Sequence, residues 1–183
     1  AVNVKLDTAG RTKALAQIDT RIKALSVLQA RINEMQRVSA SQKTSLNATL
    51  QTAIGEMTTL KAKIAADTDN AVLKADIQSI TKSYRIYLLV LPQGRITAAA
   101  DRIMGTSAIL TELAGKLQVR ITEAQAAGKD TTALTASLTD MNAKIADANV
   151  QANAAITLIA NLKPDNGDKA VFEANQKALK DAR

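Results

Sequence analysis

Apolar residues recur at steps of three and four along most of this chain. The first stripe spans residues 15–35, the second 46–64, and a shorter third stripe 72–87. Such steps place side chains on one face of an α-helix. No stretch of useful length alternates polar with β-branched or aromatic residues, as a half-buried strand would. The pattern therefore predicts an all-α fold.

Polar residues stand where these helices are expected to begin. Asp7 or Thr8 is a suitable N-cap for the first helix. Ser39, with Gln42 three residues later, has the form of a capping box for the second. A polar turn at 67–70 precedes the third helix. These signals divide the first half of the chain into three helices.

The stretch 83–103 is interpreted as the junction between two helical halves. Six consecutive apolar residues, 86–91, are followed by Pro92 and then by Gly94. No Ser, Thr, Asp or Asn stands just before the proline as an N-cap, so a kinked, nearly continuous connection is favoured over a true loop. We predict one three-helix unit over residues 1–91 and a second over 92–183.

The second half repeats the organisation of the first. A fourth helix is expected over about 93–127, ended by glycine in the usual position after a helix. Asp130 is expected to cap a fifth helix, over about 131–162, whose apolar residues alternate steps of four and three as in a coiled-coil seam. A turn at 164–168 then leads to a last helix that runs to Arg183.

Three pairs of segments match in the same order, which favours a duplicated three-helix unit over chance similarity. The offset between the halves grows from 88–89 to 99 residues, interpreted as an insertion of about three helical turns. The matching pairs are 28–36 with 117–125, 46–50 with 134–138, and 69–76 with 168–175.

The composition indicates a narrow core. The 183 residues suit one domain or two small ones. Hydrophobic residues make up 46% but aromatics only 2%, and much of the apolar content is alanine, which fills little volume. We therefore expect an elongated antiparallel helical bundle rather than a globule.

Several segments resemble parts of exported helical proteins of unknown function predicted from uncultured small-genome bacteria. The resemblance covers most of the chain and implies export, a cell-surface or envelope setting, a signal peptide already removed, and a last helix that continues further. No activity is known for that family, so it assigns no functional residue. The segments are Ile80-Thr-Lys-Ser-Tyr-Arg-Ile-Tyr87, Leu91-Pro-Gln-Gly-Arg-Ile-Thr-Ala-Ala-Ala-Asp-Arg-Ile103, 128–145 and 164–171.

The residues offer little catalytic chemistry. The chain has no cysteine and no histidine, which excludes Ser-His, Cys-His and His-metal arrangements. The aspartate-rich turns at 67–70 and 165–168 are interpreted as helix caps, because Leu162 stands where a calcium loop needs its first carboxylate. We expect no enzyme, catalytic residue, metal or cofactor.

The net charge of +7 does not indicate a nucleic-acid site. The 24 Lys and Arg residues are dispersed along all the helices, with few aromatic residues for stacking on bases. The densest group lies at the junction, where core packing of the tyrosines is favoured over a docking site for a partner's carboxylate or phosphate. This group is Tyr84, Arg85, Tyr87, Arg95 and Arg102.

The unequal helix lengths predict a second candidate surface. The last helix is half as long as the two before it, so it covers only the fifth helix from about Asp147 onward and the first half of the fourth. We predict that the uncovered part binds a partner, which is a second copy, a continuation of the last helix, or a foreign helix. Its apolar residues are Leu113, Leu117, Ile121, Leu134, Leu138, Met141 and Ile145.

Two functions remain open. The favoured one is a non-enzymatic extracytoplasmic structural or interaction module, such as a spacer, stalk or adhesin segment, which binds a protein partner or itself through helices. The alternative is an amphipathic-helix protein that binds a lipid or membrane surface. The apolar stripes are narrow and alanine-rich, which favours the first, and no apolar run approaches the roughly 20 residues of a membrane span.

Overall fold

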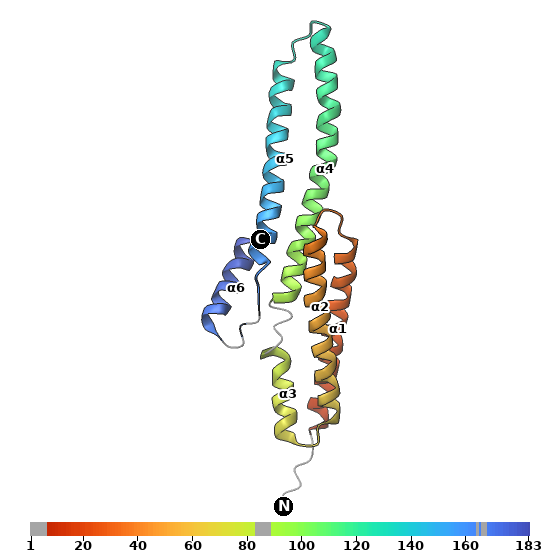
Figure 1. The fold of residues 1–183 in the computed structure, drawn as a ribbon, viewed down its shortest axis with the longest axis vertical. Coiled ribbons are helices and arrows are strands. Elements are labelled where there is room, and N and C mark those ends of the chain that lie inside the picture. The colour runs from red at the N-terminus through yellow and green to blue at the C-terminus, as the bar shows by residue number, and fades with distance from the viewer. Residues whose placement is uncertain (1–6, 83–88, 164, 166–167) are drawn as a thin grey trace, which may run out of the picture.

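The computed structural model describes residues 7–82, 89–163, 165 and 168–183, and these form an all-α helical bundle with six helices and no strand. The molecule is elongated, and its helices run close to the long axis (Figure 1). The predicted all-α fold is confirmed. The helices are α1 (Thr8–Glu34), α2 (Ala40–Ala66), α3 (Asn70–Lys82), α4 (Leu91–Ala126), α5 (Thr132–Ile159) and α6 (Lys169–Asp181).

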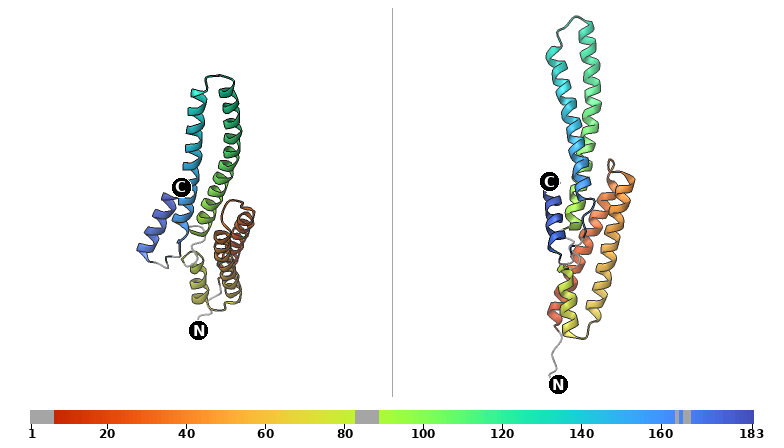
Figure 2. Two further views of the ribbon diagram at one scale, coloured as in Figure 1. Left: turned by 45° about the horizontal axis from the view of Figure 1, so that its top comes forward. Right: turned by 60° about the vertical axis from the view of Figure 1, so that its left-hand side comes forward.

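Two antiparallel helix pairs make up most of the bundle. The pair α1–α2 is covered by α3 at one end, and the first part of α4 packs along α1 (Figures 1 and 2). Beyond the α1–α2 connection, α4 continues alone with α5, which returns beside it. The short helix α6 folds back along the final part of α5. We call residues 105–150 the distal hairpin.

Side chains at the helix starts form the predicted caps. The Asp7 carboxylate accepts a hydrogen bond from the Gly10 backbone N–H at 2.8 Å. Ser39 and Gln42 form the reciprocal capping box that the sequence predicts. Each cap satisfies backbone donors that have no partner within the helix, which explains why α1 and α2 begin where they do.

Asp69 and Asp168 cap the two short helices in the same way. The Asp69 carboxylate accepts from the backbone N–H groups two and three residues on, at 2.7 and 3.0 Å. Asp168 accepts from the two equivalent groups at 2.8 and 3.3 Å. The matched segments 69–76 and 168–175 therefore both begin with an aspartate cap, and the duplication itself stays a prediction.

The start of α5 differs from the prediction. Thr131, not Asp130, occupies the N-cap position and makes no side-chain cap bond. The Asp130 carboxylate, one residue earlier, accepts from the Thr132 backbone N–H at 2.9 Å. This bond lowers the pKa of the Asp130 carboxyl below its ordinary value, and a hydrogen bond from the Thr132 side chain lowers it further.

The largest core lies where α1, α2 and α3 meet, and it extends into α4 and α5. Ala98 and Ala100 of α4 and Ala152 and Ile156 of α5 belong to the same cluster. Each fully buried large side chain contributes about 1.5–3 kcal/mol to folding. The fully buried members from the first three helices are Ile18, Leu25, Ile32, Leu50, Met57, Ile64, Leu73 and Ile80.

Two contacts position α4 on the α1–α2 pair. The Asp101 carboxylate accepts from the backbone N–H groups of Arg37 and Val38, in the α1–α2 connection, at 2.6 and 3.0 Å. At Gly94 the two helices approach so closely that an added Cβ would lie 2.4 Å from the Cδ2 of Leu28. Together they fix where α4 leaves the rest of the bundle.

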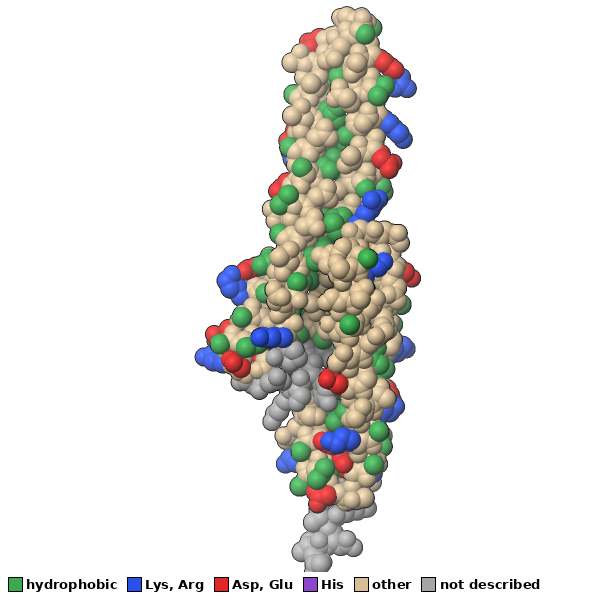
Figure 3. Space-filling model, in the orientation of Figure 1, with side chains coloured by type: hydrophobic (Ala, Val, Ile, Leu, Met, Phe, Trp, Pro, Cys, Tyr) green, Lys and Arg blue, Asp and Glu red, His purple; other side chains and the backbone are tan. Residues whose placement is uncertain are grey.

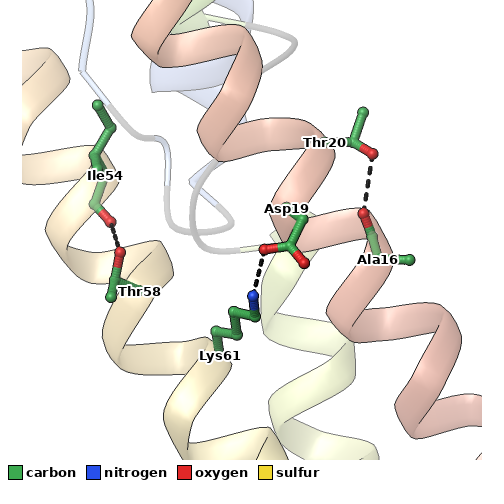
Figure 4. A network of polar contacts seen from close by, with 6 residues as sticks. All are labelled: Ala16, Asp19, Thr20, Ile54, Thr58 and Lys61. Carbon is green, nitrogen blue, oxygen red and sulfur yellow. Dashed lines mark hydrogen bonds and ion pairs between the residues drawn. The ribbon is translucent and has the colours of Figure 1, made fainter.

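Polar contacts on the surface add little to this arrangement. Lys61 of α2 pairs with Asp19 of α1 at 2.5 Å, and both side chains are well exposed (Figure 4). Exposed pairs of this kind contribute at most about 1 kcal/mol. Nearby, the hydroxyls of Thr20 and Thr58 donate to backbone carbonyls four residues earlier. Such bonds satisfy the threonine hydroxyls of these threonine-rich helices.

The junction is described only in part. Pro92 is the second residue of α4, and Val90 before it has a helical backbone and no side-chain cap. Residues 89 and 90, just before α4, are helical, whereas residues 83–88 lie outside the described residues, so the kinked, nearly continuous connection expected at Pro92 stays a prediction. The main core contains residues from both sides of Pro92. The division into units 1–91 and 92–183 stays a prediction.

The predicted insertion of three helical turns is wrong. The α2–α3 connection has three residues, 67–69, whereas the α5–α6 connection has nine, 160–168. The extra residues therefore do not all extend a helix, because α5 ends at Ile159 rather than near 162 and the described residues 160–163 that follow it are not helical. The last helix also ends earlier than predicted, at Asp181. Both halves nevertheless contain two long helices followed by a helix of 13 residues.

Candidate functional site

The distal hairpin is held together by a narrow seam. Ala114 and Ile121 of α4 and Leu138 of α5 form one buried cluster, with Met141 packed against it. Further along, Ile145 is also buried. Buried positions recur every seven residues on both helices, which is the spacing that keeps one face of a helix against its neighbour. Alanine at 114 lets the two helices approach closely.

The residues beside this seam differ sharply between its two sides. At 3.6 residues per turn, the flanking positions of two antiparallel helices fall on two opposite faces of the pair. One face, which we call the apolar flank, carries Leu110, Leu113 and Leu117 from α4 and Met141 and Ala148 from α5, with Leu134 at the tip.

The opposite face, the polar flank, carries uncharged polar residues at the equivalent positions. Thr111, Gln118 and Thr122 lie there on α4, and Asn142 and Asn149 on α5. Figure 3 shows one face of the hairpin, where hydrophobic side chains follow the groove between α4 and α5 and charged side chains lie along the outer edges. The hairpin is therefore two-sided, with one face able to bury leucines and the other suited to water.

The predicted partner surface is partly exposed and partly inside the seam. Leu113, Leu117 and Leu134 are 46%, 40% and 57% exposed. Ile121, Leu138 and Ile145 are buried, so they are not available to a partner, and this corrects their assignment to the surface. They are buried because α4 and α5 pack these positions against each other, while the flanking leucines lie outside the two-helix contact.

The short helix α6 packs against the final part of α5, below the distal hairpin, so it covers less of α5 than the predicted stretch from about Asp147 onward. Asp181 and the two residues after it line a hollow of about 420 Å³ together with residues 151–158 of α5 and 95–103 of α4. This hollow lies on the side of the apolar flank. No described element covers the flank beyond it (Figures 1 and 2).

The two described arginines of the junction group, Arg95 and Arg102, line different hollows. Arg95 lines two hollows, one with residues of α1 and the other with residues at the end of α6. Arg102 lines a different, smaller hollow with Arg31 and Glu34. Tyr84, Arg85 and Tyr87 lie outside the described residues, so the proposed docking role of this group stays a prediction.

Charge is divided unevenly along the molecule. The distal hairpin contains four Lys or Arg and five Asp or Glu residues, a net charge of −1. The remainder of the chain contains 20 basic and 12 acidic residues, a net charge of +8. The positive charge of the chain is therefore concentrated outside the hairpin.

Within the described part of the chain, no three His, Cys, Asp or Glu side chains lie close enough together to hold a metal ion. Neither does any described helix combine the length and hydropathy needed to cross a bilayer. The aspartates of the turn at 67–70 and Asp168 act on helix ends, as predicted: Asp69 and Asp168 cap helices, and the Asp67 carbonyl accepts from the Arg11 guanidinium.

Two features of the site could not be predicted from the sequence alone. The division of the distal hairpin into an apolar and a polar flank was present in the residue pattern, but finding it requires knowing that α4 and α5 pair in register. The hydrogen bond between Asp101 and the α1–α2 connection joins residues more than 60 positions apart, and no local sequence pattern predicts it.

Comparison with known proteins adds no family to this description. No protein-family model, curated protein or solved structure matches the chain. The class that the fold defines is an all-α helical bundle with a projecting two-helix hairpin.

Proposed function

We propose that this protein is a non-enzymatic interaction module, a helical spacer, stalk or adhesin segment whose distal hairpin binds a protein partner. The observation that supports the proposal most is the apolar flank, where Leu113, Leu117 and Leu134 are exposed along one face of a two-helix projection. Scattered exposed leucines are ordinary, but leucines on one face beside a helical groove are typical of helix-binding surfaces.

The remaining parts of the proposal rest on the sequence. The lack of histidine and cysteine favours a role without catalysis. The extracytoplasmic setting rests on the resemblance to exported helical proteins. The elongated bundle suits a spacer, since it carries the hairpin well away from the charged remainder of the molecule.

Hydrogen exchange tests the proposal directly. In a dilute monomer, backbone amides at residues 113–145 are expected to exchange faster than those of α1 and α2, because a two-helix seam is covered on fewer sides. Slow exchange there in a monomer, independent of concentration, contradicts a partner-seeking surface.

Flotation with vesicles distinguishes the alternative, a membrane-surface binder. Vesicles containing an anionic phospholipid are expected to bind the protein weakly and only at low salt, through the basic remainder of the chain. Binding that persists at high salt and is lost in the variant Leu113→Gln/Leu117→Gln favours insertion of the apolar flank into lipid.

A further inference from the structure

The apolar flank is two helices wide and open along its length, and we infer that its partner is a second copy of this chain. In the dimer the two distal hairpins lie face to face and antiparallel, and they form a four-helix bundle. The inference rests on the proposed function, because it names the partner for the same surface.

The size of the flank suits a reversible dimer. Residues 105–126 of α4 span about 33 Å at 1.5 Å per residue. Two adjacent helices present a face about 20 Å wide. Each copy therefore buries about 650 Å², and the total of about 1,300 Å² lies at the lower end of specific protein interfaces. We expect a dimer that dissociates on dilution.

A second copy of the chain supplies a complementary surface, because it carries the same apolar flank. Most homo-oligomers pair identical patches across a two-fold axis, so a row of exposed leucines meets the same row on its partner. Arg120 and Lys144 border the flank, and Lys144 is paired with Asp140 of its own helix at 2.6 Å. With a net charge of −1, one hairpin does not strongly repel another.

Charge and shape both favour the antiparallel orientation. The remainder of each chain carries a net charge of +8, and antiparallel hairpins place these two parts at opposite ends. Their separation of about 33 Å exceeds three Debye lengths at 0.1 M salt, so their repulsion is screened. In addition, α6 lies against α5 just below the flank. A parallel pair brings both copies of α6 together, whereas an antiparallel pair places each hairpin tip beside the partner's α6.

Sedimentation velocity over a range of concentrations is the first test. We expect the mass of the wild-type chain to rise from one copy toward two. The variant Leu113→Gln/Leu117→Gln is expected to raise the dissociation constant by about tenfold or more. Val119→Gln is the matched control, because Val119 is 57% exposed on the side of α4 that faces away from the flank. Circular dichroism verifies that each variant keeps its helical content.

Disulfide cross-linking tests the orientation, since the chain has no cysteine of its own. Leu117→Cys lies near the middle of the hairpin, close to the expected two-fold axis, and is expected to form a cross-linked dimer on oxidation. Leu134→Cys, at the tip, is expected not to cross-link with itself. Efficient cross-linking at the tip overturns the antiparallel arrangement.

The outcomes separate the two proposals. A monomer at every concentration, with fast exchange at residues 113–145, overturns self-association and leaves the proposed function in place. A monomer with slow exchange there contradicts both. A dimer that is unaffected by Leu113→Gln/Leu117→Gln overturns the assignment of this flank. Flank-dependent binding to vesicles without dimerisation assigns the surface to lipid instead.

Discussion

The close approach of α4 to α1 predicts an unusual response to the substitution of Gly94 by alanine. In most helix interiors, Gly→Ala stabilises a protein by up to about 1 kcal/mol, because glycine loses more backbone freedom on folding. At Gly94, however, the new methyl group would lie 2.4, 2.6 and 2.8 Å from the Cδ2, Cδ1 and Cγ atoms of Leu28. Leu28 is itself buried, so it has little space to move away.

The magnitude follows from these two opposing effects. Overpacking a close-packed core costs about 1–3 kcal/mol, which exceeds the gain in helix propensity. Gly94→Ala is therefore expected to lower the free energy of unfolding by up to about 2 kcal/mol. Gly115 is the control, because it lies within the same helix and a Cβ there meets nothing within 4 Å. Gly115→Ala is expected to raise the free energy of unfolding by up to about 1 kcal/mol.

Urea unfolding followed by circular dichroism measures both variants, and a double-mutant cycle identifies the cause. Leu28→Ala alone is expected to cost about 2–5 kcal/mol. In the Gly94→Ala background it is expected to cost about 1–3 kcal/mol less, because the clash is then removed and the new methyl group fills part of the cavity.

Two results refute this reasoning. If Gly94→Ala stabilises the protein as much as Gly115→Ala, the helices do not approach as described. If Leu28→Ala costs the same in both backgrounds, the destabilisation arises elsewhere in α4. A change in the urea dependence of unfolding indicates instead that the two helix pairs no longer unfold together.

Three further predictions concern the hydrogen-bonding carboxylates of Asp101 and Asp130 and the turn at Gly128. Asp101→Ala is expected to destabilise the protein by about 1–3 kcal/mol in urea unfolding, because two backbone donors of the α1–α2 connection lose their partner, while Asp101→Asn retains an acceptor and costs less. Gly128→Ala is expected to cost about 1–2 kcal/mol by the same assay, since Gly128 has a φ of +71° and no neighbour within 4 Å, so only the backbone conformation opposes the methyl group. The pKa of Asp130 is lowered in the folded state, so its contribution to stability is complete above the ordinary aspartate pKa of about 3.9 and is lost as the pH falls through the folded value. NMR titration is expected to show this lowered pKa, and the stability difference between wild type and Asp130→Asn is expected to vanish at low pH; an unshifted pKa contradicts the bond to Thr132.

Local signals in the sequence predicted the helices well. The capping box at Ser39 and Gln42, the glycine after α4 and the cap at Asp168 each act within a few residues, so sequence spacing is enough to find them. The start of α5 lies one residue later than predicted, because the backbone places Thr131 rather than Asp130 at the N-cap position. Element lengths near the α5–α6 turn were overestimated for a similar reason, since the apolar spacing continues to Leu162 after the helix has ended.

Contacts between distant residues were not predictable in the same way. The positions of Leu113 and Ile121 are both apolar and lie two turns apart, yet one is exposed and the other buried. The difference depends on the angle at which α4 faces α5, which only the pairing of the two helices determines. The contact of Leu28 with Gly94 likewise depends on where α4 crosses α1.

Each half of the molecule contains a pair of long helices, but other helices cover the first pair more completely than the second. The α1–α2 pair is covered near one end by α3, and the start of α4 packs against α1 further along, so its apolar residues are largely buried. The α4–α5 pair is longer, because α4 spans about 54 Å, whereas the 13 residues of α6 span about 20 Å. A helix of that length closes only the base of the pair. The exposed row at Leu113, Leu117 and Leu134 therefore follows from the mismatch in helix length, and any helix placed on it restores the three-helix cross-section that the first half already has.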